Sequence, residues 1–255
     1  MRLSNDEERL RRYRTNSQPQ RQDKAAGRCG KKFRCVATCP SSRPLGTLLN
    51  DNVLHIGVGL RLGVRLCLPN HCQCGAAVEE YGNHGWSCMK SAGRVSGYDA
   101  LNETIRKALV SAGIFARLEP KEMLEVDRRR PDGITYIPWK EEKALTWDVT
   151  YVDTVALSHV VDSTERVGSG AEDAEKKKTE KYSDFGSQYL FYPVDLRTFG
   201  TRGPFARHLL DVVGRKMTEQ SEESRSVQFS EQRIAVDIQR GNCYFVLDTV
   251  EESIG

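Results

Sequence analysis

Four side chains that commonly bind zinc lie close together in the sequence CLPNHCQCGAAVEEYGNHGWSC. They are Cys72, Cys74, His84 and Cys88. Zinc takes four thiolate or imidazole ligands in a tetrahedron, and residues four apart meet on one side of a short helix. The spacing predicts a Zn²⁺ site, in which Cys67 or His71 could replace one ligand. The alternative is a group of buried free thiols beside an ordinary loop histidine.

Two aspartates farther along the chain suit a different metal. Asp132 follows a proline at the start of one apolar segment, and Asp148 lies inside the next. If these segments pair as a hairpin, both carboxylates can reach one Mg²⁺ or Mn²⁺ ion, and such an ion can activate water for attack on a phosphate. The alternative is structural, with a turn at Asp132 and a salt bridge from Asp148 to Arg130 or Lys143.

A cationic side chain is also needed to steady the phosphate, and the position two residues after Asp148 is occupied by Thr150. Residues 170–188 predict a helix, on which Lys178 and Lys181 continue the face of two alanines. The sequence therefore predicts that these lysines approach the carboxylates in space.

The elements that must position these groups follow from hydrophobic periodicity. Residues 93–113 predict a helix, because an apolar stripe follows a Ser96–Asp99 capping box. Strands are predicted for residues 116–127, 132–139, 143–152 and 189–200. Three successive strands, a helical return and a further strand predict an α/β fold with a mixed sheet flanked by helices.

Composition divides the chain into three parts. Hydrophobic residues make up 38% and charged residues 29% of the 255 residues, which indicates that part of the chain lies outside a core. Residues 1–46 predict a poorly ordered basic segment. Residues 47–94 hold a lead-in, which over residues 53–60 is strand-like or a short buried segment, and the cysteine cluster. Residues 95–250 form the predicted α/β domain.

Charge and hydropathy bear on location and partners. No apolar run approaches the roughly 20 residues of a membrane span, which predicts a soluble, intracellular protein with no membrane partner. Its cysteines are then expected as thiols or metal ligands. The formal net charge of +3 is too small to indicate nucleic-acid binding, but basic residues gather locally before Pro131. They are Arg128, Arg129 and Arg130.

The motifs CQCG, GNHGWSC, RPDG, WDVT and KTEKY stand in this order, and PVDLRTFGTRG follows them. From about residue 47 onward they resemble the C-terminal region of non-LTR retrotransposon polyproteins. In that family a CCHC zinc knuckle precedes a restriction-like endonuclease domain of the PD-(D/E)xK superfamily, and a reverse transcriptase lies upstream. The resemblance implies an αβββαβ nuclease core and a metal-dependent DNA endonuclease.

The resemblance also implies roles for particular residues. Asp132 and Asp148 would be metal ligands, Lys178 and Lys181 catalytic lysines, and Glu119 an acidic helper. The cluster of three cysteines and one histidine would be the zinc knuckle.

The expected partner is DNA, with RNA as the alternative, and the expected location is nuclear. Phosphate contacts from Arg94 and from the basic residues before Pro131 would hold the nucleic acid, with Trp86 as a stacking surface. Packing inside the knuckle is the alternative role of Trp86. A catalytically inactive nucleic-acid-binding relic of the same element is the alternative function, and a structural remnant without activity is the third.

Overall fold

We describe a computed structural model of the chain over residues 46–120, 130–152, 178–180, 182 and 189–250. The main sheet has four strands in the order β3–β4–β5–β6. These strands are β3 (Ala116–Leu118), β4 (Gly133–Lys140), β5 (Lys143–Val152) and β6 (Tyr189–Arg197). Neighbouring strands run antiparallel except β5 and β6, which run parallel. The predicted mixed sheet is confirmed.

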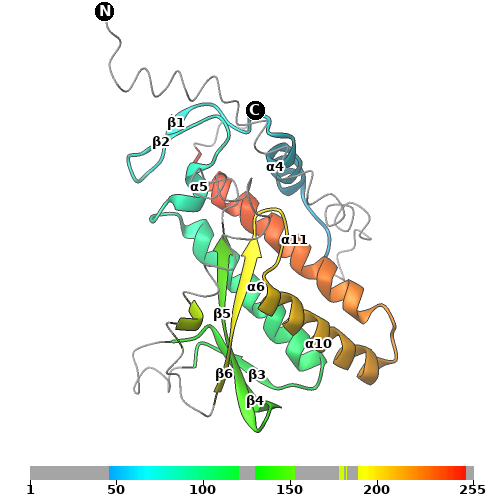
Figure 1. Ribbon diagram of the computed structural model, residues 1–255. Helices are drawn as coiled ribbons and strands as arrows, with labels where there is room; N and C mark the ends of the chain where they lie inside the picture. Colours follow the sequence, from blue (N-terminus) through cyan, green and yellow to red (C-terminus); the bar gives the residue numbers. More distant parts are fainter. Residues whose placement is uncertain (1–45, 121–129, 153–177, 181, 183–188, 251–255) are drawn as a thin grey trace, which may run out of the picture.

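Helices cover one face of this sheet. The helices are α4 (Asp51–Leu62), α5 (His84–Ser87), α6 (Ala92–Ser111), α10 (Pro204–Ser221) and α11 (Ser226–Leu247). α6, α10 and α11 share one apolar core with the sheet, and α4 packs against α11 in a second core (Figure 1). A small ribbon of β1 (Asn70–His71) and β2 (Ala77–Val78) precedes α5.

The alternation of side chains along β5 separates the core from the opposite face of the sheet. Leu145, Trp147 and Val149 are 0%, 0% and 3% exposed and belong to the core under the helices. Successive side chains of a strand point to opposite faces, so Asp148 lies on the other face. The strand therefore buries its apolar side chains and presents its carboxylate away from the helices.

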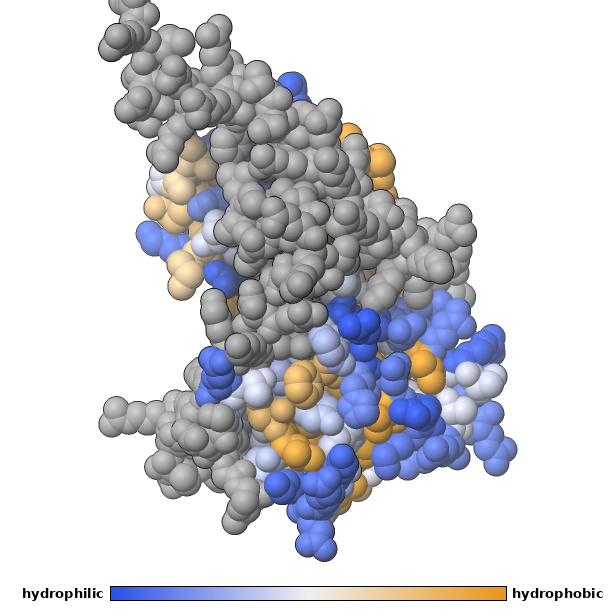
Figure 2. Space-filling model, in the orientation of Figure 1, coloured by the Kyte–Doolittle hydropathy of each residue, from blue (hydrophilic) through white to orange (hydrophobic). Residues whose placement is uncertain are grey.

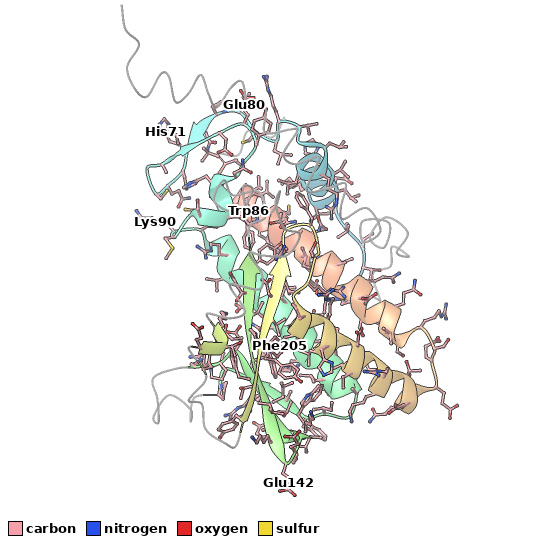
Figure 3. All side chains as sticks on the ribbon, viewed as in Figure 1. His71, Glu80, Trp86, Lys90, Glu142 and Phe205 are labelled. Atoms are coloured by element: carbon pink, nitrogen blue, oxygen red, sulfur yellow. The ribbon has the colours of Figure 1, made fainter. Side chains whose placement is uncertain are left out.

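A glycine allows β4 and β5 to pack at the start of their hairpin. Gly133 pairs with Trp147, and a Cβ atom at Gly133 would lie 2.0 Å from the indole ring. At the far end, Glu141 and Glu142 both have positive φ, as a tight two-residue hairpin turn requires (Figure 3). The hairpin predicted from the two apolar segments is present.

The strand-like prediction for residues 53–60 is wrong, because this segment lies in α4. Asn50 caps the helix by accepting a hydrogen bond from Val53 N at 2.9 Å. Gly63 ends it in the left-handed conformation. The buried side chains Val53, Ile56 and Leu60 follow the helical period.

The predicted start of the next helix also needs correction. α6 begins at Ala92, so Ser96 and Asp99 lie inside it and form no capping box. Gly93 and Gly97 let this early part of α6 approach α11 closely, since a Cβ atom at Gly93 would lie 2.5 Å from the Tyr244 carbonyl oxygen. The predicted domain boundary after residue 94 therefore falls within a helix.

On the lower part of the face drawn in Figure 2, hydrophilic side chains are interspersed with apolar ones. Tyr136 and Ile137 of the hairpin are among the exposed apolar residues. A surface of this composition is ordinary for a folded domain. Within the described ranges, none of the helices combines the length and apolar character that crossing a membrane requires.

Candidate functional site

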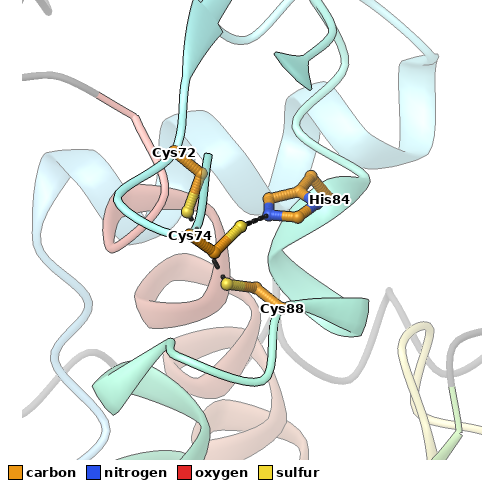
Figure 4. Close-up of side chains that lie close together, drawn as sticks. All are labelled: Cys72, Cys74, His84 and Cys88. Carbon is orange, nitrogen blue, oxygen red and sulfur yellow. Dashed lines mark hydrogen bonds between the residues drawn. The ribbon is translucent and has the colours of Figure 1, made fainter. Parts of the chain in front are cut away.

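The structure brings the four predicted zinc ligands together. The ligand atoms of Cys72, Cys74, His84 and Cys88 all lie within 4.8 Å of one another (Figure 4). Cys74 Sγ is 3.2 Å from His84 Nε2, and Cys72 Sγ is 3.6 Å from Cys88 Sγ. Sulfur ligands about 2.3 Å from a tetrahedral zinc lie roughly 3.8 Å apart. This group of three thiols and one imidazole can hold a metal such as zinc.

Two local structures explain why the close C-x-C spacing works. Cys72 and Cys74 lie in the turn between β1 and β2, where Gly75 N donates to Cys72 O at 2.8 Å. Gly75 has φ 88°, a conformation that favours glycine. His84 begins the short helix α5 and Cys88 caps its end, so one helical turn presents both side chains, as predicted.

The electrostatics of the cluster favour a thiolate at Cys74. A hydrogen bond from the backbone of Ala76 is the main cause that lowers the pKa of Cys74 to about 7, and the side chains of Cys72 and His84 add to it. Burial raises the pKa of Cys72. Zinc binds thiolates, so Cys74 is prepared for a metal before one binds.

Neither alternative zinc ligand belongs to this group. Cys67 donates its thiol to the carbonyl of Glu79 at 3.3 Å, and His71 pairs with Ala77 in the small ribbon. The simplest ligand set is therefore the one with the predicted C-x-C and H-x-x-x-C spacing.

The cluster is anchored on the C-terminal part of α11. A Cβ atom at Gly85 would lie 2.1 Å from the Phe245 carbonyl oxygen, so only glycine fits at this contact. Trp86, labelled in Figure 3, is 8% exposed, and its ring packs edge-to-face on Phe245 with ring centroids 6.2 Å apart. This burial favours the packing role of Trp86 over a stacking surface for bases. Its aromatic partner, Phe245, belongs to α11 and not to the knuckle.

The second site lies where β4 and β5 meet. The antiparallel register pairs Gly133 with Trp147, so Asp132, one residue before β4, lies beside Asp148 of β5, whose charge acts on it. Asp132 Oδ2 accepts a hydrogen bond from Val149 N at 2.7 Å. The two predicted aspartates therefore lie at one place on the sheet.

Lys178 reaches Asp148 from a segment distant in sequence. Lys178 Nζ donates to Asp148 Oδ1 at 2.6 Å and to the Val149 carbonyl at 3.3 Å. This salt bridge differs from both structural alternatives, which paired Asp148 with Arg130 or Lys143. Residues 178–180 are helical, and apart from Tyr182 the rest of the predicted helix, including Lys181, lies outside the described residues.

Two further residues hold the aspartates, and neither was predicted. Tyr182 donates its hydroxyl to Asp148 Oδ2 at 3.1 Å, and its ring stacks on Phe191. Asn102 of α6 accepts from the Trp147 indole at 3.1 Å and hydrogen-bonds Asp132. Their signals were present in sequence. Tyr182 stands four residues after Lys178, and Asn102 is a polar residue beside the apolar stripe of α6.

Like charge and burial act together at Asp132. Burial is the main cause that raises the pKa of Asp132, and the nearby Asp148 charge raises it further. Hydrogen bonds from Val149 and Asn102 and the Lys178 charge lower it in part. A half-buried carboxylate whose pKa is raised beside a second carboxylate is an arrangement that a divalent cation relieves, because the cation neutralises negative charge there.

The remaining predicted residues lie at the margins of this site or outside the described chain. Glu119 donates its backbone N–H to the Asp132 carbonyl at 2.8 Å, and its exposed carboxylate pairs with Arg130. Arg94 lies near the knuckle, with Nη1 3.6 Å from Met89 Sδ. Arg128 and Arg129 lie outside the described residues.

Comparison with family models and with curated protein sequences finds no match to this chain. A function is therefore proposed from the geometry of the two sites.

Proposed function

We propose that this protein is a metal-dependent DNA endonuclease with a restriction-like αβββαβ core, derived from a non-LTR retrotransposon. One observation carries the proposal. Asp132, just before β4, lies beside Asp148 of β5, and Lys178 donates to Asp148 from a segment thirty residues away. Two acids and one lysine from three separate segments is the group that the resemblance implies.

The order of elements supports the proposed core. α6 is followed by the three antiparallel strands β3, β4 and β5, then by helical residues 178–180, then by β6 parallel to β5. This order is helix, three strands, helix, strand, as the αβββαβ arrangement requires. The acids lie on β5 and just before β4; Asp148 is on the face that the core helices leave free, and Asn102 of α6 reaches Asp132.

The donor set fits Mg²⁺ or Mn²⁺. Asp132 and Asp148 offer hard carboxylate oxygens, and each ion of this type typically binds one or two carboxylates and completes its shell with water and phosphate oxygens. When bound there, the ion supplies a Lewis acid for the phosphate and lowers the pKa of a water molecule. The two aspartates orient it, and Asn102 and Val149 N fix the Asp132 carboxylate.

The chain's own cation completes the proposed chemistry. Lys178 brings an ammonium group to the acids, where it can stabilise negative charge that develops on the phosphate during attack by water. Water adds to phosphorus, and the bond from phosphorus to the leaving sugar oxygen breaks. Tyr182 holds Asp148 in place through its hydroxyl.

The knuckle and the exposed basic residues are proposed to hold the nucleic acid. Arg94 lies beside the zinc cluster, and Arg130 lies beside the acids. Contacts of this kind go mainly to phosphates and weaken as salt is raised. DNA is the proposed substrate, and RNA is the alternative.

The direct test is a plasmid-nicking assay with Mg²⁺, Mn²⁺ or EDTA. We expect the wild type to nick with either metal, EDTA to stop it, and Asp132→Ala to lower the rate at least about a hundredfold, since a metal ligand acts on the transition state. The matched control is Asp211→Asn, which changes an exposed aspartate of α10. Activity in Asp132→Ala equal to that of the control would contradict the nuclease assignment.

The inactive binding relic is the second candidate, and one observation favours it. Both oxygens of Asp148 are occupied, by Lys178 and by Tyr182. A protein that binds plasmid DNA in a salt-dependent manner but shows no nicking with either metal would fit this candidate.

A further inference from the structure

Asp195 of β6 is the least expected polar residue on the sheet face that carries Asp148. It is 1% exposed, and within the described residues no donor lies at hydrogen-bonding distance from either of its carboxylate oxygens, although the Arg197 charge is near. Arg197 Nε lies 3.7 Å from Asp195 Oδ2, beyond hydrogen-bonding distance. A buried, charged acceptor without a donor is costly unless another group reaches it.

The register places Asp195 within reach of Lys178. Thr150 and Asp195 are partners in the parallel β5–β6 pair, and Asp148 precedes Thr150 by two residues on the same face. Strand spacing and rise put the Cα atoms of Asp148 and Asp195 roughly 8 Å apart. Lys178 acts electrostatically on both Asp132 and Asp195 from its place at Asp148. The long lysine side chain can therefore pass from one carboxylate to the other.

Lys178 and a divalent cation compete for one oxygen. The ammonium group lies 2.6 Å from Asp148 Oδ1, in the position that a cation bound by this carboxylate would need. Two positive charges cannot share that oxygen without strong repulsion. A metal ion bound at the acids repels the Lys178 ammonium group and weakens this contact, so the partly buried ammonium group, 23% exposed, gains from another acceptor.

We propose that Asp195 is a positioning residue that receives the Lys178 ammonium group when a divalent cation binds at Asp132 and Asp148. Lys178 thus has two carboxylate partners, Asp148 without the cation and Asp195 with it. In the second position it remains charged and close to the phosphate. This inference rests on the proposed metal-dependent function and adds a residue that acts through the lysine.

The test measures Mn²⁺ binding to the full-length, zinc-loaded protein. The concentration of free Mn²⁺ is determined from its electron paramagnetic resonance signal. Asp195→Asn is measured with Lys178 present and in a Lys178→Met background. We expect Asp195→Asn to weaken Mn²⁺ binding about fivefold to tenfold when Lys178 is present, and less than about twofold in its absence. Asp132→Asn gives the baseline without the site, and Asp211→Asn is the exposed control.

The outcomes separate the inference from the function. If Asp195→Asn weakens Mn²⁺ binding equally with and without Lys178, Asp195 acts as a direct ligand or a distant charge. If it weakens Mn²⁺ binding in neither background, Asp195 has no role in cation binding. Either result overturns this inference and leaves the proposed function in place. Mn²⁺ binding that does not depend on Asp132 would overturn the proposed function and this inference with it.

A second measurement avoids substituting Asp195, in case that change prevents folding. The ¹⁵N-labelled ammonium signal of Lys178 is assigned by its loss in Lys178→Met. We expect Mg²⁺ to shift the signal while its protons stay protected from exchange with water, because they remain bonded to a buried acceptor. Rapid exchange with water on addition of Mg²⁺ would overturn the proposal.

Discussion

At the scale of single residues, Asp195 shows how a functional position can oppose stability. Burial is the main cause that raises its pKa to about 6, and it prevails over Arg197 and Lys178, which lower the pKa. The ordinary value of 3.8 applies in the unfolded chain. The folded protein therefore binds a proton at Asp195 more tightly than the unfolded chain does, and it loses stability when that proton leaves.

We predict that Asp195→Asn changes the pH dependence of unfolding. The contribution of the protonated carboxyl is fully present below about pH 4 and is lost as the pH rises through about 6. The variant should match the wild type at pH 4 and exceed its free energy of unfolding by about 3 kcal/mol at pH 7, from a shift of roughly two pKa units. Urea unfolding at several pH values measures this difference.

Asp211→Asn is the control for that experiment, because Asp211 is exposed on α10. Its difference from the wild type should stay constant across the same pH range. A difference for Asp195→Asn that is equally constant would contradict a raised pKa at Asp195.

The residues that could be predicted from sequence are those whose chemistry is local. The zinc ligands follow from spacing, and Asp132, Asp148 and Lys178 follow from strand pairing and a helix face. Tyr182, Asn102 and Asp195 were not predicted, because their roles depend on which strands and helices become neighbours. Asp195 stands in an apolar segment like many structural residues, and only the parallel pairing with β5 places it near Lys178.

At the scale of elements, the β4–β5 hairpin depends on one glycine. The Trp147 indole lies across Gly133 and is 0% exposed, so there is no room for a side chain at that position. Any Cβ atom would push the indole away from Asn102, its hydrogen-bond partner. Asn102 also contacts Asp132, so the acid site would move with it.

We predict that Gly133→Ala lowers the free energy of unfolding by about 2 kcal/mol or more, because overpacking a rigid core forces side chains and backbone to shift. Gly241→Ala is the matched control. A Cβ atom at Gly241 meets its nearest neighbour at 3.8 Å, and alanine favours a helix over glycine by roughly 1 kcal/mol, so this variant should be as stable as the wild type or more stable. Thermal unfolding of Gly133→Ala and Gly241→Ala measures the difference. Equal destabilisation of the two variants would contradict the prediction.

The strands were predictable and several helices were not, because the spacing of apolar residues is clear in the strands and hidden in some of the helices. β5 alternates strictly between apolar and polar side chains, which only a strand explains. α4 contains glycines that break its apolar pattern, so its helical period was hidden, although Asn50 and Gly63 mark its ends. α10 and α11 were not predicted, yet α10 carries apolar residues at helical spacing after Pro204, a pattern that sequence analysis can detect.

At the scale of the whole molecule, the zinc cluster is part of one packed body. The second core joins α4, the α5 residue Trp86 and the α11 residues Phe245 and Val246. The cysteines pack against Val250, just beyond α11. Loss of the metal should therefore loosen more than the small ribbon and α5.

We predict that the purified protein holds about one zinc per chain, and that Cys88→Ser loses it and lowers the melting temperature of the whole chain in a single transition. Elemental analysis and calorimetry measure the two effects. Cys67→Ser is the matched control and should keep the zinc, because Cys67 lies outside the cluster. Native protein without zinc, or a separate transition for the knuckle, would contradict this prediction.

The packing of α4 on α11 has a consequence for how the chain reaches its native state. Arg61 donates to Gln239 across 178 residues of sequence, and β5 pairs with β6 across a long connection. Contacts between distant parts of a chain slow folding, because the connecting loops lose entropy before the contacts form. During synthesis, α4 and the knuckle leave the ribosome long before the helix that covers them. Their apolar surfaces stay uncovered until α11 has been made, and exposed apolar surface of this kind favours aggregation of the incomplete chain.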